Sequence, residues 1–254
     1  IKAGSFEKSY LNSRLIYRKS VDFIIKNSKI ILVEGEIYKP FLKNKYNVDA
    51  FYFPNVVPVD EIPTITREKF QDDFFKILFV GYAYEGKGVI ELLESCLHLA
   101  LDGNKIILTI VGELHNDIRK YIDNMNTSVN FTLKIKGKLK HVMVLQEFEL
   151  NDIYCYPSKH SGEGHNNTIN EALMCQMVIC STMHGFLGSF LNEENSYPIH
   201  FLTSKSLEIK LKEIIYDIEL ARLKSKKGRQ LILEQFNTDN AQKKLKSIYK
   251  KLLN

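Results

Sequence analysis

The sequence predicts an α/β protein in which a parallel β-sheet is covered by helices on both faces. Two observations lead to this prediction. Between about residues 76 and 181, short and continuous apolar runs alternate with segments whose apolar residues recur at helical spacing. Strands that are apolar along their whole length are typical of parallel sheets buried on both faces. In addition, a glycine or serine ends or follows several of these strands, at the edge where such sheets bind ligands.

The composition bounds the class of protein. The chain has 254 residues, 44% hydrophobic and 26% charged, which is ordinary for a globular protein of one large or two modest domains. No apolar run approaches the ~20 residues that span a bilayer, and no signal peptide is visible. The four cysteines form no C-x-x-C pair, so free thiols in a reducing cytosol fit best. We therefore expect a cytoplasmic protein. The chain begins with Ile1, and we expect it to be part of a longer one.

The net charge of +5 is unevenly distributed. From Phe201 onward the chain has 13 Lys and Arg against 6 Asp and Glu. The plainest interpretation is a solvated helical face. The sharper alternative is peripheral contact with an anionic membrane, on its inner face in the cell, or with an anionic acceptor. No interleaved aromatic and basic motif of the RNA-binding type occurs, so we expect no nucleic-acid partner.

The first 55 residues predict a small unit. Its elements are a short buried strand over residues 29–33, a helix over 37–45 and a second strand over 50–55. The proline-rich residues 56–73 show little periodicity, and we interpret them as an interdomain linker.

After this linker the alternation is regular. The predicted strands cover residues 76–81, 105–112, 129–137, 152–156 and 178–181, and the predicted helices cover 89–101, 117–125 and 168–174. Residues 207–253 are expected to be helical, with breaks at Gly228 and at 236–239, and with Thr238 or Asp239 as the cap of the last helix. The chain thus divides into residues 1–55, the linker 56–73, a domain over 74–236 and a final helix over 237–254.

One candidate site lies between Gly81 and Gly88. A glycine at a strand end lets a ligand approach the backbone closely, and Lys87 lies between two glycines where the next helix begins. A lysine and helix N–H groups together can hold a phosphate. The segment matches neither a Walker loop nor G-x-G-x-x-G, and a tight turn with a solvated lysine would also explain it.

A second candidate site contains Glu163 and Glu171. Glu163 lies in a turn-rich segment that follows a strand end, between Gly162 and Gly164, and Thr168 lies near the expected start of a helix. Carboxylates accept hydrogen bonds from paired sugar or ribose hydroxyls, and helix starts hold anions. A sugar nucleotide has both kinds of group. Two solvated carboxylates are the plain alternative.

The remaining combinations of reactive residues are weaker. His160, Glu163 and His165 match no metal-binding spacing, and we expect no metal or other cofactor. No Ser-His-Asp or Cys-His order has a supporting context. Paired-carboxylate hydrolysis would need the two glutamates to face one bond, whereas a helix approach would aim them at different parts of a ligand.

Together these motifs resemble the C-terminal, donor-binding half of a retaining glycosyltransferase of group 1 (family 4), with the GT-B fold. The resemblance covers about residues 75–200. Phe79-Val80-Gly81 with Lys87-Gly88 is similar to the family's FVG-R-x4-KG segment, and Ile110-Val111-Gly112 to its IVG strand end. Tyr156-Pro157-Ser158, Glu163-Gly164, Thr168-Ile169 and Glu171-Ala172-Leu173 resemble its PS and E-x7-E motifs.

The resemblance implies roles for these residues. Lys87 would neutralise the donor diphosphate, and Glu163 would contact the donor sugar near the developing oxocarbenium ion. Glu171 would accept hydrogen bonds from the ribose. The other residues that the resemblance places at the donor are Gly81, Tyr82, Gly137, Lys138, Gly164, Asn167 and Thr168. The chemistry would be glycosyl transfer with retention, from a nucleotide sugar to a saccharide or lipid-linked acceptor, in polysaccharide or glycolipid synthesis.

The chain departs from the family pattern in two places. Tyr82 stands where the family usually has an arginine, so one of two cationic contacts to the phosphates is missing; Lys138, Lys140 and Lys159 are candidates to compensate. Only about 55 residues precede the linker, and no histidine occurs before His98. In this family an N-terminal domain holds the acceptor and usually a catalytic histidine. The resemblance implies that residues 1–55 are a remnant of that acceptor-side domain and that the helix over 237–254 crosses back to it. We therefore expect the chain by itself to lack acceptor binding and to be inactive.

Two alternatives to a transferase are considered. The departure at Tyr82 also suits a non-catalytic module that binds nucleotide sugar or a protein partner. An epimerase on the same fold would need its own acid–base residues, and the sequence offers none that we can assign.

Overall fold

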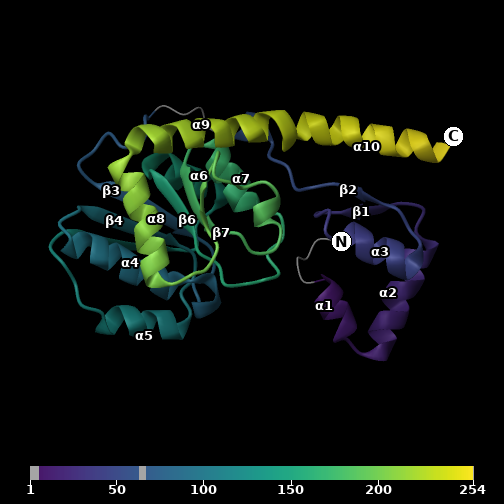
Figure 1. The fold of residues 1–254 in the computed structure, drawn as a ribbon, viewed down its shortest axis with the longest axis horizontal. Helices are drawn as coiled ribbons and strands as arrows, with labels where there is room; N and C mark the ends of the chain where they lie inside the picture. The colour runs from purple at the N-terminus through teal and green to yellow at the C-terminus, as the bar shows by residue number, and fades with distance from the viewer. Residues whose placement is uncertain (1–5, 63–66, 254) are drawn as a thin grey trace.

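The computed structural model describes residues 6–62 and 67–253 and contains two parallel sheets (Figure 1). The larger sheet has six parallel strands in the order β5-β4-β3-β6-β7-β8. These are β3 (Phe75–Val80), β4 (Ile106–Val111), β5 (Phe131–Gly137), β6 (Ile153–Tyr156), β7 (Val178–Thr182) and β8 (Tyr197–Ile199). The predicted α/β class with a parallel sheet is confirmed.

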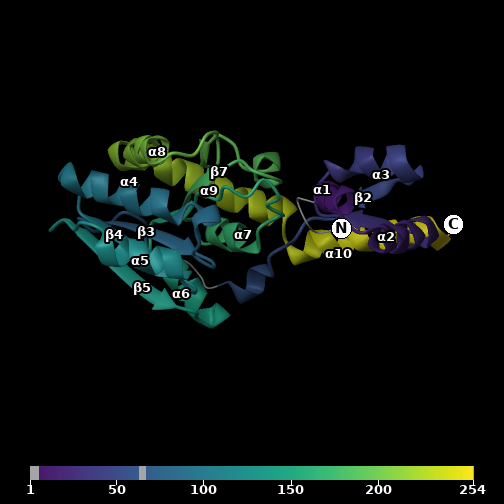
Figure 2. The same cartoon turned by 90° about the horizontal axis from the view of Figure 1, so that it is seen from below.

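Helices cover both faces of this sheet (Figure 2). They are α4 (Val89–Leu101), α5 (Asn116–Asn124), α6 (His141–Leu150), α7 (Asn167–Met174), α8 (Ser204–Tyr216) and α9 (Ile218–Gln235). Helix α4 packs against α8, and α7 packs against α9. Strands β6 and β7 are buried along their whole length, β4 at all but one residue and β3 over its central residues, because their apolar side chains have helices on either side. All four cysteines are buried and free.

The strand order reverses between β3 and β6. From β3 the chain adds β4 and then β5 in one direction, and afterwards crosses back to place β6 on the other side of β3. Where the order reverses, the connections at the carboxyl ends of the two central strands diverge and leave a crevice. The connections that leave β3 and β6 here contain Lys87 and Glu163, respectively.

The N-terminal residues form a smaller unit. It consists of α1 (Phe6–Leu11), α2 (Leu15–Asn27), β1 (Ile31–Val33), α3 (Tyr38–Tyr46) and β2 (Ala50–Tyr52), and β1 pairs with β2 in parallel. Its apolar cluster also includes Phe186, which comes from the loop after β7. The ring of Phe186 lies 5.1 Å from that of Tyr38, edge to face.

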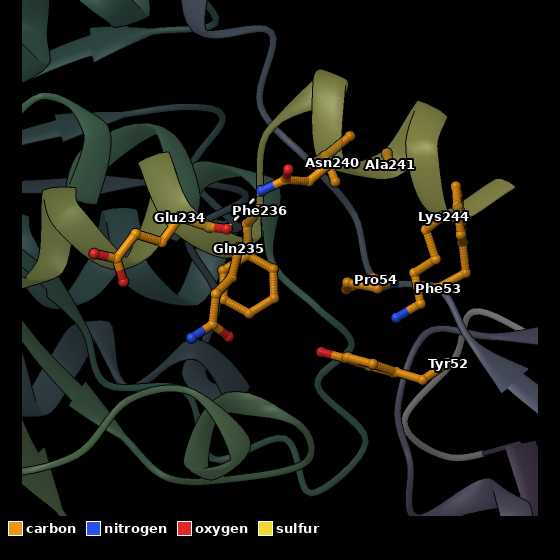
Figure 3. Close-up of a pocket in the computed structure, with 10 residues that line it drawn as sticks. Tyr52, Phe53, Pro54, Glu234, Gln235, Phe236, Asn240, Ala241 and Lys244 are labelled. Carbon is orange, nitrogen blue, oxygen red and sulfur yellow. Dashed lines mark hydrogen bonds between the residues drawn. The ribbon is translucent and has the colours of Figure 1, made fainter. Parts of the chain in front are cut away.

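The last helix extends from the large sheet toward the small one. Helix α10 (Thr238–Leu253) continues the direction of α9 and lies beside the β1–β2 sheet (Figures 1 and 2). The ammonium of Lys244 lies 4.8 Å from the centre of the Tyr52 ring. A cavity of about 430 Å³ separates the α9–α10 junction from the segment after β2 (Figure 3).

The predicted linker is partly ordered against the large domain. Val57 donates its N–H to the carbonyl of Phe236, and residues Val59–Glu61 form one 3₁₀ turn. Arg67 and the N–H of Phe70 bind the carboxylate of Asp152 at the start of β6. Residues 63–66, in the middle of the predicted linker, lie outside the described residues.

Four elements were not predicted from the sequence, namely helices α1, α2 and α6 and strand β8. The break predicted within the tail was misplaced. The tail does not break at Gly228, which lies inside α9, where an added Cβ would be only 2.4 Å from the Leu173 side chain. The break falls instead at Asp217, whose carboxylate caps α9 by accepting from the N–H of Leu220.

The predicted break at 236–239 is confirmed, but its cap lies one residue earlier than expected. Asn237 Oδ1 accepts from the N–H of Asn240 at 2.9 Å and so caps α10, in place of Thr238 or Asp239. Among the helices that the structure describes, none is both long and apolar enough to cross a membrane.

Candidate active site

Lys87 and Glu163 form an ion pair at the point where the strand order reverses. Their Nζ and Oε1 atoms lie 2.5 Å apart, and both side chains are largely buried. Lys87 ends a 3₁₀ turn that follows β3, and Gly88 then adopts φ +67° and starts α4. A Cβ at Gly88 would lie 2.0 Å from the carbonyl oxygen of Pro157. Glycine is therefore required here to bring the β3 and β6 connections together.

Two hydroxyl groups complete this cluster. Tyr156 accepts from the Lys87 ammonium at 2.7 Å and donates to Glu163 Oε2 at 3.1 Å. Ser158 donates to Glu163 Oε1. Thr182 fixes Ser158 by donating to its carbonyl at 2.6 Å. We call Lys87, Tyr156, Ser158 and Glu163 the central cluster.

The pKa values of the cluster reflect burial and mutual contact. Burial by itself would lower the pKa of Lys87, but hydrogen bonds to Glu163 and Tyr156 outweigh it and raise this pKa above its ordinary value. Burial, together with the negative charge of Glu163, raises the pKa of Tyr156 to about 12. The lysine is therefore a cation and the tyrosine a neutral hydroxyl at neutral pH.

Three neighbouring strands end at, or one residue before, a glycine. Gly81, Gly112 and Gly137 follow or end β3, β4 and β5, with φ values of +149°, +127° and +61°. Their backbones are joined through Gly112, whose N–H donates to the carbonyl of Gly137 at 2.7 Å. A Cβ at Gly112 would meet the Gly81 carbonyl oxygen at 2.0 Å. The glycine backbones thus form one continuous surface at the carboxyl edge of the sheet.

The N-terminus of α7 is capped by the side chain of Asn166, the residue just before the helix. Asn166 Oδ1 accepts from the N–H groups of Thr168 at 2.9 Å and Ile169 at 3.4 Å. A ligand anion at these two groups would therefore have to displace the Asn166 side chain. Asn167 is exposed at the helix start, and Gly164 is half-buried between Glu163 and the cap.

Glu171 lies in the same helix and contacts a residue that the sequence analysis did not select. Its Oε1 lies 3.0 Å from Nε2 of His141, the first residue of α6. The Glu171 side chain is mostly buried and that of His141 is mostly exposed. His141 thus covers the carboxylate that the sequence analysis assigned to the ribose.

Tyr82 is half exposed, and its ring lies 5.8 Å from that of Tyr84 and 6.3 Å from that of His115. Of the candidate replacements for the missing arginine, Lys159 is bound to Glu91 at 2.6 Å. Lys138 and Lys140 are exposed between β5 and α6. These two lysines remain candidates for a second cationic contact.

His165 serves the link between the two units. Its N–H donates to Glu34 Oε1 at 2.7 Å, and its carbonyl accepts from Asn55 at 2.7 Å. Its ring packs against Phe190 and Phe236, and burial lowers the pKa of the imidazole to about 4. Within the part of the chain that the structure describes, His160, Glu163 and His165 form no metal-binding group.

Sequence reasoning missed Tyr156 and His141 as members of the site. Ser158 was expected at the ligand-binding edge of the sheet but was given no role there, and Tyr156 was used only as part of a strand end and of the family's PS motif. No pattern in the sequence pointed to His141, since its contact to Glu171 depends on how α6 and α7 pack.

Comparison with known proteins identifies the family. The model of the family described as "Glycosyl transferases group 1" matches residues 62–231. An uncharacterized glycosyltransferase of Methanocaldococcus jannaschii is 25% identical over 251 residues, which cover 95% of this chain and 61% of the relative. The capsular polysaccharide biosynthesis glycosyltransferase CapM of Staphylococcus aureus is 24% identical over 224 residues, covering 83% and 57%. The chain thus spans about three fifths of these relatives' length.

Solved structures share the fold. Sucrose-phosphate synthase from Thermosynechococcus elongatus superposes with a TM-score of 0.77 at 16% identity, covering 96% of this chain and 63% of that one. A mutant of S. aureus TarM, in complex with UDP among other ligands, gives 0.74 at 19% identity, covering 91% and 46%. The fold is of the GT-B type. Because the family model covers more than half of the sequence, this chain belongs to the group 1 glycosyl transferases.

Proposed function

We propose that this chain forms the donor side of a glycosyltransferase that takes a sugar from a nucleoside diphosphate sugar and transfers it, with retention, to a saccharide or lipid-linked acceptor in surface polysaccharide or glycolipid synthesis. The observation that carries this proposal is the central cluster, in which a largely buried lysine and a buried carboxylate meet where the strand order reverses.

Each part of a nucleotide sugar has a matching group here. The diphosphate would lie on the glycine backbones after β3 and β4, against the ammonium of Lys87. Glu171 would accept from the ribose hydroxyls, and Lys138 would lie near the base or phosphates beyond Gly137. Glu163 would contact the sugar next to the bond that breaks.

The chemical step would depend mainly on electrostatics. As the bond from the sugar to the diphosphate breaks, negative charge grows on the leaving oxygen and positive charge grows on the sugar ring. Lys87 would stabilise the first charge and Glu163 the second. The names of structural neighbours support this class of ligand: TarM is solved with UDP, and Alr3699/HepE of Anabaena with UDP-glucose. CapM, a curated relative, is named for capsular polysaccharide biosynthesis.

The proposal is tested in two steps. Isothermal titration of the protein with UDP should show saturable binding at one site. Incubation of a protein that includes any sequence flanking this chain with a panel of UDP- and GDP-sugars should then release free nucleoside diphosphate, and the release should be lost in Glu163→Gln. Absence of binding for every nucleotide in the panel would contradict the proposal.

One observation favours a second candidate, a non-catalytic module that binds the donor. The segment after β3 has Tyr82 where a second cation is expected, and Lys159 is occupied by Glu91. With a single phosphate-binding cation, binding could persist while the leaving group is too weakly stabilised for turnover. Binding of UDP without any release from sugar nucleotides, in a protein that includes the flanking sequence of the gene, would support this candidate.

A further inference from the structure

Tyr156 lies at the centre of the site, between Lys87 and Glu163. Its location at the end of a strand does not by itself explain this position. Its side chain is buried, and its hydroxyl lies between Lys87 Nζ at 2.7 Å and Glu163 Oε2 at 3.1 Å. Its ring lies nearly parallel to those of Phe79 and Tyr154, with interplanar angles of 12° and 14°. Packing therefore fixes the direction in which the hydroxyl points.

The ion pair presents a problem for a phosphate ligand. The Lys87 ammonium has three N–H donors, and it already binds Glu163 and Tyr156. A diphosphate would draw the ammonium toward itself, and Glu163 would then lose its cation. A buried carboxylate without a partner is costly and tends to take up a proton. A protonated Glu163 could not stabilise positive charge on a sugar.

The hydroxyl groups provide a solution to this problem. Tyr156 and Ser158 both donate to Glu163, one to each oxygen. Neither bond depends on Lys87, since Tyr156 receives from the lysine and donates to the carboxylate. Hydrogen bonds to the charged form of an acid favour that form.

We propose that Tyr156 is a positioning residue that keeps Glu163 ionised and oriented when Lys87 turns from the carboxylate to the phosphates of the donor. The inference rests on the proposed function for its ligand, while the contacts that carry it are present in the unliganded chain.

Other titratable and charged groups lie near Glu163. The neighbouring loops contain His160, whose Nδ1 accepts from the N–H of Gly162, and His184, next to Gly185. Lys159 is paired with Glu91 and Glu85.

Tyr154 provides a matched control. It is a buried tyrosine of the same strand, two residues earlier, and its ring stacks on that of Tyr156. Its hydroxyl donates to the carbonyl oxygen of Val80 at 3.5 Å, and among the hydrogen bonds of the described residues it makes none to Lys87 or Glu163. Tyr154→Phe therefore reproduces the loss of a buried hydroxyl from β6 without touching the ion pair.

The first test uses the unliganded protein. Tyr156→Phe and Glu163→Gln should be coupled in thermal unfolding, with a Tm for the double variant that departs from the sum of the single shifts by about 2 °C or more. The same cycle with Tyr154→Phe should be additive. Additive shifts in the Tyr156 cycle would overturn the inference.

The second test measures protons that accompany binding of UDP. Titrations in two buffers of different ionisation enthalpy at about pH 6 should show more proton uptake for Tyr156→Phe than for the wild type or Tyr154→Phe. As the pH is lowered from 8 to 5.5, the UDP affinity of Tyr156→Phe should rise relative to that of the wild type by up to about tenfold. The phosphate of UDP also titrates in this range, but equally for every variant, so that the differences report on the protein.

The outcomes separate the two proposals. Equal proton uptake in Tyr156→Phe and Tyr154→Phe, with UDP bound normally, would overturn the role of Tyr156 and leave the proposed function standing. Failure of the wild type to bind any nucleotide would count against the proposed function, and the unfolding cycle would still decide whether Tyr156 holds the pair.

Discussion

Oε1 of Glu171 lies 3.0 Å from Nε2 of His141, so that the carboxylate proposed to bind the ribose already has a hydrogen-bonding partner. The two residues come from neighbouring helices, and the histidine is the more exposed. A ribose that reaches Glu171 must therefore share the carboxylate with His141 or displace it.

The first prediction concerns this pair. Glu171→Ala should weaken UDP binding by about tenfold or more, because a hydrogen bond to a charged group is lost. It should also abolish the preference of the protein for UDP over 2′-deoxy-UDP. His141→Ala should keep that preference, since the carboxylate remains. Calorimetric titration with both nucleotides checks this, and a preference that survives in Glu171→Ala would remove Glu171 from the ribose.

The second prediction concerns the phosphate-binding cation. Lys87→Ala should lower the affinity for UDP at least tenfold but change that for uridine, which has no phosphate, much less. Lys105→Ala is the control, because Lys105 lies just before β4, at the opposite end of that strand from Gly112, and pairs with Asp73 at 3.6 Å. Equal losses for UDP and uridine in Lys87→Ala would indicate general damage instead of phosphate binding.

The same variant has a consequence for stability. Removing Lys87 leaves the buried Glu163 without its cation, and breaking a buried pair on one side costs about 3–5 kcal/mol. Because Tyr156 and Ser158 still donate to the carboxylate, we expect the lower end of that range, measured by urea unfolding. Lys87→Ala combined with Glu163→Gln should recover part of the loss.

The third prediction concerns pH and His165. The pKa of this buried imidazole is lowered from 6.5 to about 4, so as pH falls the unfolded chain takes up the proton first. The contribution of neutral His165 to the free energy of unfolding is therefore fully present above pH 6.5, and it is lost as the pH falls from about 6.5 to 4. At pH 5 the free energy of unfolding should be lower by about 2 kcal/mol through this group. His165→Gln should show a smaller decline, and parallel pH profiles would contradict the prediction.

The fourth prediction concerns the backbone that faces Glu163. Gly185 has φ +61°, and a Cβ there would lie 2.0 Å from the Glu163 carbonyl oxygen. Gly137 has the same φ but no atom within 4 Å of its would-be Cβ. Gly137→Ala should therefore cost only the left-handed strain of about 1–2 kcal/mol, and Gly185→Ala clearly more. Equal decreases in Tm for the two variants would mean that the structure accommodates the added Cβ at Gly185 at little cost in free energy.

The sequence predicted the large sheet well because its strands are apolar along their whole length, as at residues 76–81. Helix α6 was missed because its apolar residues occur on all sides, among them Val142, Met143 and Val144, without a clear helical period. Strand β8 was missed because it has three residues and contains Pro198. Short edge strands are defined by their pairing partner and not by their own pattern.

For the candidate site, the sequence predicted the charged residues better than their neighbours. Lys87 and Glu163 each lie at the spacing from neighbouring motif residues that the family pattern has, and the structure brings them into contact. The hydroxyl of Tyr156 and the imidazole of His141 become part of the site only through tertiary packing. The cap at Asn166 was likewise missed, although an asparagine before a helix is a usual signal for one.

Phe186 gives the small unit a direct effect on the chemistry proposed for the large one. Its ring is buried in the apolar cluster of the N-terminal unit, and its N–H donates to the carbonyl of Glu163 at 3.0 Å. An added Cβ at Gly35 would overlap that ring, so the fit is close. A change in the packing of the N-terminal unit around this ring would therefore act on the backbone of Glu163 through that hydrogen bond. Residues of the N-terminal unit would thus influence the position of the Glu163 carboxylate. A substitution at Gly35 would affect the central cluster indirectly, through Phe186.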